Sequence, residues 1–251
     1  MTSTLQLEPC PTPALVAERC ADLVQRCLAE HTEPVLLVPA GNTPVLLFAE
    51  LVLRHKRGEL DLGKAHLFQL DELVGVPPKD PRSFQRFVRD QLQTPLSLSE
   101  DRLHLLDGTA PDPVAEIERH ASTLRELGEA HLALLGIGQN GHVAFNEPGS
   151  SKTLPARLVH LAEPTLAGLR GSFEEHEVPT QGITLGIFEL YAASEVALLA
   201  TGRSKAGILS QLVSAPSSDE LPASHFRDHP SFHIFHDEDA GSQLSGGATA
   251  Y

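Results

Sequence analysis

The sequence predicts an α/β fold in which a doubly wound, mainly parallel sheet forms a single domain over residues 1–251. Short apolar runs, as found in buried strands, alternate along the chain with longer segments whose apolar residues recur at helical spacing. This alternation is typical of a parallel sheet with helices on both faces. Hydrophobic residues make up 41% of the 251 residues and no linker-like stretch divides them, so we expect one sizeable core.

Each expected element has a local signal. Short apolar runs predict strands over residues 34–38, 65–70, 103–106, 131–136, 195–200 and 231–236. Helical spacing or a capping residue followed by proline predicts helices over residues 14–28, 45–57, 80–93, 113–127, 183–191 and 204–213. Two helix starts are specific: Thr43 as N-cap before Pro44, and Asp80 before Pro81.

Two stretches lack regular spacing. Residues 150–182 contain Pro155, Pro164 and Pro179, and an irregular stretch of this length is expected to be a lid over a binding site. The tail, residues 241–251, is small and polar, which predicts disorder.

The composition argues against several classes of partner. The formal net charge is −14, so nucleic acid and anionic membrane surfaces are not expected to bind. The sequence shows no leader-like start and no apolar run of about 18 residues. Cys10, Cys20 and Cys27 form no CxxC pair. We therefore expect a cytoplasmic protein with buried thiols.

The strongest candidate site follows the strand expected at residues 131–136. A glycine-rich turn leads there into HVAFNEP, which places His142 and Glu147 where open α/β sheets bind ligands. GIGQNG also fits the dinucleotide pattern G-x-G-x-x-G letter for letter. Pro148 and Pro155 would interrupt the helix that such a fingerprint needs, so a loop presenting the two titratable side chains is the better interpretation.

Two acids end another expected strand. Asp71 and Glu72 follow the apolar run 65–70, and carboxylates are rarely buried there without a partner. One of them is a candidate general base. An exposed loop pair or a helix-capping acid is the alternative.

A candidate anion site comes from two further strand ends. Gly41, Asn42 and Thr43 precede a helix and can gather N–H groups around an anion, or they only begin that helix. Lys205 lies at the junction of the strand 195–200 and the next helix, where it can reach an anion or simply be solvated.

A set of histidines near the end of the chain raises a metal hypothesis. The set is His225, His229, His233 and His236. Pro230 separates its members into a helical and a strand-like pair, so we predict no metal site.

Four segments together resemble the glucosamine-6-phosphate deaminase family, whose wider superfamily includes 6-phosphogluconolactonases. They are PAGNTP (residues 39–44), FQLDELVG (68–75), GIGQNGHVAFNEPGSS (136–151) and TGRSKA (201–206). The resemblance implies a modified Rossmann-like fold. It also implies a reaction that opens the sugar ring, isomerises aldose to ketose and releases ammonia, with no metal or organic cofactor.

The resemblance implies a role for each candidate residue. Asp71 would move the C2 proton, and His142 would handle the protons of ring opening with Glu147 orienting it. Glu72 would contact the substrate beside Asp71. A carboxylate and an imidazole suit this chemistry because both can give and take protons near neutral pH when their surroundings adjust the pKa.

The phosphate would be held by the amides of residues 41–43 and by Lys205. Arg170 of the lid would add a contact, although its alignment with the family needs a one-residue gap. The expected partner is therefore a small sugar phosphate, bound by a monomer or a homo-oligomer.

Asn140 departs from the family, which usually has Asp at this position. We count it among the catalytic group, because an amide can still hydrogen-bond the imidazole of His142. Without a charge there, the pKa of His142 and its rate are expected to fall. Relatives that act on galactosamine 6-phosphate can carry NGH here, so that sugar is an alternative substrate.

Two other departures concern the loops. Asn42 replaces the usual second glycine, and asparagine tolerates positive φ. Arg157 matches an effector-binding arginine of allosteric relatives, but Val159 stands where their lysine is, so activation by an amino-sugar phosphate is not expected.

Two rival functions remain. Phosphogluconolactonases share the loop around His142 but generally lack the FNEP continuation. The second rival is a non-catalytic sugar-phosphate sensor, in which Asn140 would indicate that activity has been lost.

Overall fold

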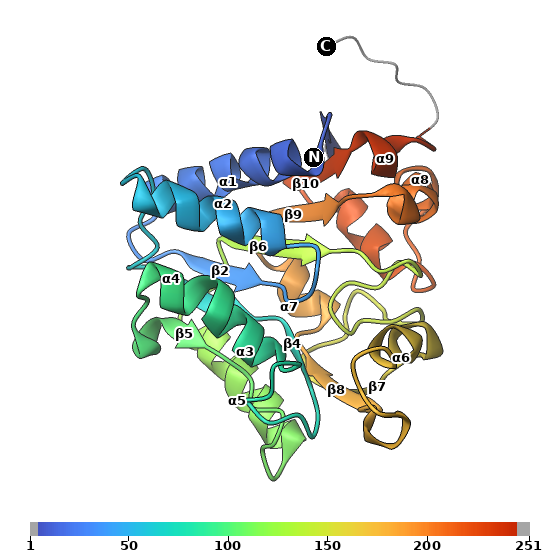
Figure 1. Ribbon diagram of the computed structural model, residues 1–251. Helices are drawn as coiled ribbons and strands as arrows, with labels where there is room; N and C mark the ends of the chain where they lie inside the picture. Colours follow the sequence, from blue (N-terminus) through green and yellow to red (C-terminus); the bar gives the residue numbers. More distant parts are fainter. Residues whose placement is uncertain (1–4, 245–251) are drawn as a thin grey trace.

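A seven-stranded parallel sheet forms the centre of the molecule, with the order β1-β10-β9-β6-β2-β3-β5 (Figure 1). The structure, a computed structural model, describes residues 5–244. The strands of this sheet are β1 (Leu5–Cys10), β2 (Val35–Val38), β3 (His66–Gln69), β5 (Leu103–His104), β6 (Leu132–Gly136), β9 (Glu195–Ala200) and β10 (Phe232–Asp237).

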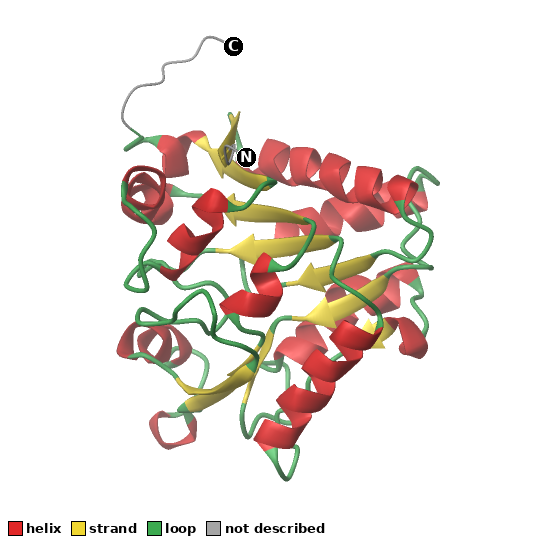
Figure 2. Cartoon of the chain, turned by 180° about the vertical axis from the view of Figure 1, so that it is seen from behind, coloured by secondary structure: helices red, strands yellow, loops and turns green. Residues whose placement is uncertain are grey.

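Helices cover both faces of the sheet (Figure 2). The α-helices of the described chain are α1 (Pro13–Glu30), α2 (Val45–Lys56), α3 (Phe84–Val88), α4 (Thr94–Leu96), α5 (Pro113–Glu126), α6 (Glu163–Leu169), α7 (Ile187–Tyr191), α8 (Ala206–Ser214) and α9 (Glu238–Gly241), of which α6 lies beside the pocket and not on the main sheet. One apolar core lies between the sheet and α1, α2 and α4, and a second lies between the sheet and α5, α7 and α8. The predicted doubly wound, mainly parallel fold is confirmed.

A smaller antiparallel sheet adjoins the carboxyl edge of the main sheet. It has the order β4-β8-β7, with β4 (Asp71–Leu73), β7 (Arg157–His160) and β8 (Gln181–Thr184). β7 and α6 belong to the stretch 150–182 that was expected to form a lid. A third apolar cluster, built on Leu73, Phe145, Leu161 and Phe173, joins this stretch to β4 and to the loop after β6.

The strand order places a topological switch point at the centre of the sheet. From β2 the chain moves outward to β3 and β5, and it then returns to the other side of β2 as β6. Open α/β sheets bind ligands at such a point, outside the carboxyl ends of the strands. All four segments that carry candidate residues follow β3, β2, β6 and β9, which are consecutive neighbours in the sheet.

Some elements differ from the prediction because their partners are distant in sequence. The edge strand β1 was not predicted, since it lacks a buried apolar run and forms by pairing with β10. The segment 183–191 was expected to be helical throughout, but Ile183 pairs with Glu72 in β8 and α7 begins only at Ile187. The predicted tail begins at Gly241, which ends α9, and residues 245–251 lie outside the described chain.

Two helix starts were also predicted wrongly. Pro44, not Thr43, is the N-cap of α2, and no side chain caps that helix. α3 begins at Phe84, where the Ser83 hydroxyl accepts a hydrogen bond from the Arg86 N–H. Asp80 accepts a hydrogen bond from the Arg82 N–H within the preceding turn. A capping pattern therefore marks a turn correctly here but not the first helical residue.

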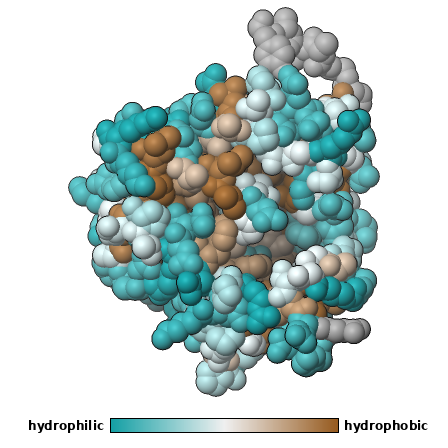
Figure 3. All heavy atoms as spheres, in the orientation of Figure 1, coloured by the Kyte–Doolittle hydropathy of each residue, from teal (hydrophilic) through white to brown (hydrophobic). Residues whose placement is uncertain are grey.

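The outer side of α2 is unusually apolar. Val45, Leu46 and Leu53 are exposed there and form an apolar patch on the face shown in Figure 3. Leu47 and Phe48, on the other side of the helix, are fully buried. Apolar spacing predicted the helix correctly, although only part of its apolar surface faces the core.

Candidate active site

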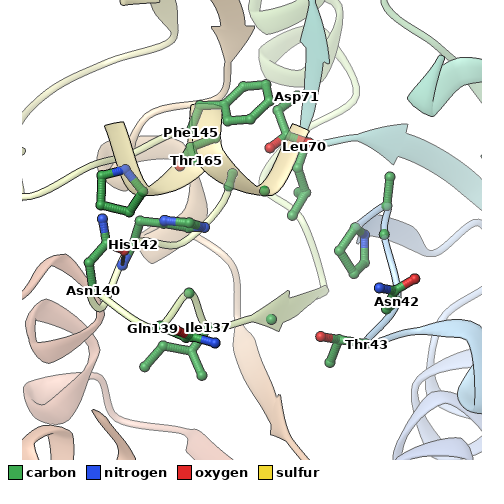
Figure 4. Close-up of a pocket in the computed structure, with 18 of the residues that line it drawn as sticks. Asn42, Thr43, Leu70, Asp71, Ile137, Gln139, Asn140, His142, Phe145 and Thr165 are labelled. Atoms are coloured by element: carbon green, nitrogen blue, oxygen red, sulfur yellow. Dashed lines mark hydrogen bonds between the residues drawn. The ribbon is translucent and has the colours of Figure 1, made fainter. Parts of the chain in front are cut away.

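The strand ends converge on one pocket of about 680 Å³ (Figure 4). The predicted site residues that line it are Gly41, Asn42, Thr43, Asp71, Asn140, His142 and Lys205. A carboxylate, an imidazole, an ammonium group and a backbone loop thus face one cavity.

Asp71 supplies the carboxylate. It begins β4 directly beyond the end of β3, and it is only 6% exposed (Figure 4). Phe84 and Phe145 line the same pocket, with ring centroids 5.8 Å apart. Burial and then the charge of Glu72 raise the pKa of Asp71 to about 8. Asp71 can therefore take up and release a proton near neutral pH.

Glu72 lies away from the pocket, so the expected substrate contact through Glu72 is corrected. Its side chain is fully buried. The carboxylate accepts hydrogen bonds from the Ser83 hydroxyl at 2.8 Å and from the N–H groups of Phe84 and Gln85 at 3.1 and 2.7 Å. Burial raises the pKa of Glu72 although these bonds oppose the shift. The helix-capping alternative is the one that the structure shows, because Glu72 holds the start of α3.

The loop after β6 positions His142. The N–H of Gly138 donates to the His142 carbonyl at 2.9 Å, and Gly141, at φ +85°, closes the turn. A Cβ atom on Gly138 would lie 2.3 Å from Cε1 of His142, so the imidazole occupies the space of a side chain. Turns rather than a helix follow. The glycines therefore shape a loop and do not open a helix, as predicted.

Glu147 lies behind His142 as a buried carboxylate. Its Oε2 atom is 3.3 Å from Nδ1 of His142, and its Oε1 atom accepts a hydrogen bond from the Thr165 hydroxyl. Burial alone would raise the pKa of Glu147, but the contacts with His142, Thr165 and Asn140 outweigh it and lower the pKa to about 2. Glu147 is therefore an ionised carboxylate directly beside the imidazole ring of His142.

Asn140 contacts Glu147 rather than the imidazole, which corrects the expected hydrogen bond to the ring of His142. Its Nδ2 atom donates to Glu147 Oε2 at 2.8 Å. Its Oδ1 atom accepts from the backbone N–H of His142 at 3.3 Å. The amide therefore supplies both a donor and an acceptor, and it holds Glu147 and the loop in one arrangement.

The loop after β2 forms the opposite wall of the pocket (Figure 4). Gly41 has φ +96°, and Asn42 is not among the described residues with positive φ. The positive φ in this loop is therefore at Gly41, which the chain has kept, and not at Asn42. Thr43 lies against β6, where a Cβ atom on Gly136 would be 3.4 Å from its Oγ1 atom. Thr43 therefore packs within ordinary contact distance of β6 at Gly136.

Lys205 reaches the pocket from the turn η4 (Arg203–Lys205), which precedes α8. Its Nζ atom donates to the Ile137 carbonyl at 2.8 Å, and burial lowers its pKa. The ammonium group is thereby fixed beside the loop after β6, where it can meet an anion that enters the pocket.

The structure does not bring the two other candidate arginines into the pocket. Arg170 pairs with Glu163 at 2.5 Å, and both side chains are exposed. Arg157 donates to Asn146 Oδ1 at 2.8 Å and to Ser150 Oγ at 3.0 Å. The guanidinium group expected to meet an effector in allosteric relatives therefore binds the chain itself.

The lid contributes site residues that were not predicted. Pro164, Thr165, Ala167, Gly168 and Leu169 of α6 line the pocket. They come from the stretch without periodic spacing, so only its length and its position after HVAFNEP indicated a role. No local signal singles out Thr165, because its partner Glu147 is 18 residues away.

Among residues 5–244 no group of three or more His, Cys, Asp or Glu side chains could hold a metal ion. His229 bonds the Ala193 carbonyl and His233 bonds Glu195, so these histidines have separate partners. The three cysteines are buried and free, as predicted. No helix in the described part of the chain is long and apolar enough to cross a membrane.

Comparison with known proteins agrees with this geometry. A family model described as "Glucosamine-6-phosphate isomerases/6-phosphogluconolactonase" matches residues 12–234. The glucosamine-6-phosphate deaminase 1 of Giardia intestinalis is 33% identical over 95% of this chain and 89% of its own length. The glucosamine-6-phosphate deaminase of Rhodopirellula baltica is 33% identical over 96% of this chain and 97% of its own length.

Solved structures show the same relationship. A monomeric glucosamine-6-phosphate deaminase matches 95% of this chain and 100% of its own, with a TM-score of 0.92 and 28% identity. The 6-phosphogluconolactonase from Trypanosoma cruzi matches 98% of this chain and 99% of its own, with a TM-score of 0.76 and 18% identity. The latter likeness concerns the fold alone.

Proposed function

This chain belongs to the family of glucosamine-6-phosphate isomerases and 6-phosphogluconolactonases, and we propose on that basis that it is a glucosamine-6-phosphate deaminase. The enzyme converts glucosamine 6-phosphate and water into fructose 6-phosphate and ammonia. The observation that carries the proposal is that Asp71 and His142 face one pocket from the ends of β3 and β6, on either side of β2, with the ionised Glu147 behind the imidazole.

These groups support a sequence of proton transfers. His142 takes the proton of the anomeric hydroxyl and delivers one to the ring oxygen, which opens the ring. Asp71, as a carboxylate, then takes the proton from C2 and returns it to C1, while O1 gains a proton and the amino nitrogen on C2 loses one. The product is the 2-imine of the ketose, to which water adds, and ammonia leaves. Glu147 stabilises His142 in its protonated form between the first two transfers.

The anion site supports a phosphorylated substrate. The loop of residues 41–43 and Lys205 line the pocket from the strands on either side of β6. An ammonium group and a loop with N–H groups suit a phosphate despite the net charge of −14, because both lie within the pocket. The phosphate end and the reacting end of one sugar can thus be held by different strand ends.

Galactosamine 6-phosphate is the second candidate substrate, favoured by Asn140. Its amide engages Glu147 through a donated hydrogen bond that an aspartate could not make when ionised. Lactone hydrolysis is less well supported, since the segment Asn146-Glu147-Pro148 is retained and Glu147 contacts His142.

The deciding experiment supplies the full chain with glucosamine 6-phosphate, galactosamine 6-phosphate and 6-phosphogluconolactone in separate assays. Ammonia, ketose phosphate and acid release are followed together. Glucosamine 6-phosphate is expected to give ammonia and fructose 6-phosphate in equal amounts. The proposal would be refuted if only the lactone were turned over, with release of acid. It would also be refuted if the chain bound these compounds but turned over none of the three.

A variant then tests the role of Asp71. Asp71→Asn should abolish exchange of the C2 proton with deuterium from the solvent while leaving binding of the phosphorylated sugar nearly intact. Asp90→Asn, at an exposed acid paired with Arg86, is the matched control. Equal exchange in Asp71→Asn and in the wild type would remove Asp71 from its role.

Three wider expectations remain predictions. They are a cytoplasmic location, a place in the breakdown of amino sugars, and the choice between monomer and homo-oligomer.

A further inference from the structure

We propose that Thr165, on the lid helix α6, is a positioning residue that makes the arrangement of Glu147 and His142 depend on the lid. The proposal rests on the proposed function, because it concerns how His142 is held for ring opening. It assigns a role to a hydroxyl group that does not itself need to touch the sugar.

The two oxygens of Glu147 have different partners. Oε2 faces the loop that carries Glu147, where it meets Asn140 at 2.8 Å and His142 at 3.3 Å. Oε1 accepts a hydrogen bond from the Thr165 hydroxyl. Among the described residues, Thr165 is the partner of this carboxylate that comes from outside the loop. The orientation of the carboxylate is therefore fixed at one oxygen by its own loop and at the other by the lid.

The helix that carries Thr165 is lightly held. None of the residues of α6 is fully buried, and its side chains Leu166 and Leu169 pack at the margin of the small third cluster. Segments with few buried apolar contacts open more readily than the core. When α6 moves away from the pocket, Glu147 must lose the hydrogen bond from Thr165.

Losing the hydrogen bond from Thr165 changes how strongly Glu147 interacts with His142. A hydrogen bond from a hydroxyl stabilises the carboxylate and draws negative charge toward Oε1. Without it, Oε2 becomes the stronger acceptor, so the protonated imidazole of His142 is held more firmly and gives up its proton less readily. With the lid in place, the proton of His142 is released more easily.

Few charged groups compete with this effect. The ionisable side chains that line the pocket together with His142 are Asp71 from β4 and Lys205 from the turn before α8. The pocket-lining residues of α6 carry no charge. The loop of residues 41–43 likewise presents no ionisable side chain. A change at Thr165 thus reaches His142 through Glu147.

The test compares variants of the full chain. Thr165→Val keeps the shape and loses the hydroxyl, and Thr165→Ser keeps the hydroxyl. Thr180→Val is the matched control, since Thr180 lies in the same lid stretch with an exposed side chain. Two readouts are needed: kcat and KM for glucosamine 6-phosphate, and the pH titration of the His142 imidazole nitrogens by NMR, assigned by their loss in His142→Gln.

We expect Thr165→Val to lower kcat by roughly 10- to 100-fold, the effect of one hydrogen bond to a charged group, with KM changed by no more than a factor of about three. The midpoint of the His142 titration should move to higher pH. Thr165→Ser should restore both values, and Thr180→Val should leave both as in the wild type.

The proposal is overturned if the His142 titration of Thr165→Val matches that of the wild type, or if Thr165→Ser is as deficient as Thr165→Val. The NMR readout needs no turnover. If the wild type proves inactive on all three sugar phosphates, the proposed function fails, while a titration that moves in Thr165→Val and not in Thr165→Ser still supports the contact.

Discussion

Gly138→Ala should disable the site while leaving the fold intact. The added Cβ atom would lie 2.3 Å from Cε1 of His142 and 2.5 Å from both ring nitrogens. Carbon atoms in contact are about 3.5 Å apart at closest, so the imidazole must move by roughly 1 Å. A shift of that size in a reacting group can cost about 100-fold in rate. Gly138 is not among the described residues with positive φ, so alanine imposes no backbone strain.

The assay measures kcat/KM for glucosamine 6-phosphate and the free energy of unfolding in urea. We expect kcat/KM to fall by about 100-fold or more and stability to change by no more than about 1 kcal/mol. Gly207→Ala is the control, because within residues 5–244 its Cβ atom would meet only Gln243 Oε1, at 3.7 Å. Full activity in Gly138→Ala would show that His142 need not occupy its observed position, and the reasoning would fail.

Three further predictions concern ionisable groups. Asn140→Asp should lower kcat/KM about tenfold at pH 7.5, because it replaces a hydrogen bond to Glu147 by repulsion between two carboxylates. The loss should be smaller at acid pH, where one proton shared by the two carboxylates relieves the repulsion. A kcat/KM above that of the wild type throughout a pH series would contradict this. Asp71→Asn should raise the free energy of unfolding at pH 9 by on the order of 2 kcal/mol. Because the folded pKa of this carboxyl group is raised to about 8, the wild type loses stability as pH rises from about 4 to about 8, and at pH 9 the loss is complete. Equal urea midpoints for variant and wild type at pH 9 would disprove it. Burial lowers the pKa of His120 to about 4, so on acidification the unfolded chain takes up this proton before the folded chain does. The free energy of unfolding should therefore fall by about 3 kcal/mol between pH 6.5 and 4. His120→Gln should make urea unfolding less dependent on pH in this range, and an unchanged slope would count against the prediction.

The sequence predicts several of the residues that line the pocket, because each of them follows a predicted strand. Asp71 and His142 each follow a short apolar strand, and the carboxyl ends of parallel strands share one edge of a sheet. The loop of residues 41–43 and Lys205 follow strands in the same way. Nothing beyond strand position was needed to bring these groups together.

The contacts that were predicted wrongly depend on distant partners. Glu72 is as polar as Asp71 and adjacent to it, but successive residues of a strand point to opposite faces, and Glu72 meets the start of α3. Its capping of α3 depends on donors more than ten residues away, at Phe84 and Gln85. The edge strand β1 likewise exists through its pairing with β10 near the far end of the chain.

The lid shows a different limit. The length of the stretch 150–182 indicated that it would lie at the pocket, but which of its side chains enter the pocket depends on how β7 pairs with β8. That pairing fixes the position of α6 and with it the contact between Thr165 and Glu147. A stretch without periodicity carries no sequence signal for such a choice.

The order of the four central strands fixes the distances between the strand ends that carry the site residues. Neighbouring strands lie about 4.8 Å apart, so the three intervals from β3 through β2 and β6 to β9 span roughly 14 Å. Because hydrogen bonds between strands hold these intervals, the spacing between Asp71 and the two parts of the phosphate anchor, the loop of residues 41–43 and Lys205, cannot adapt to a longer or shorter carbon chain. A pentose or heptose phosphate anchored by its phosphate would present a different carbon to the base, so the backbone of the sheet itself selects substrates by their length.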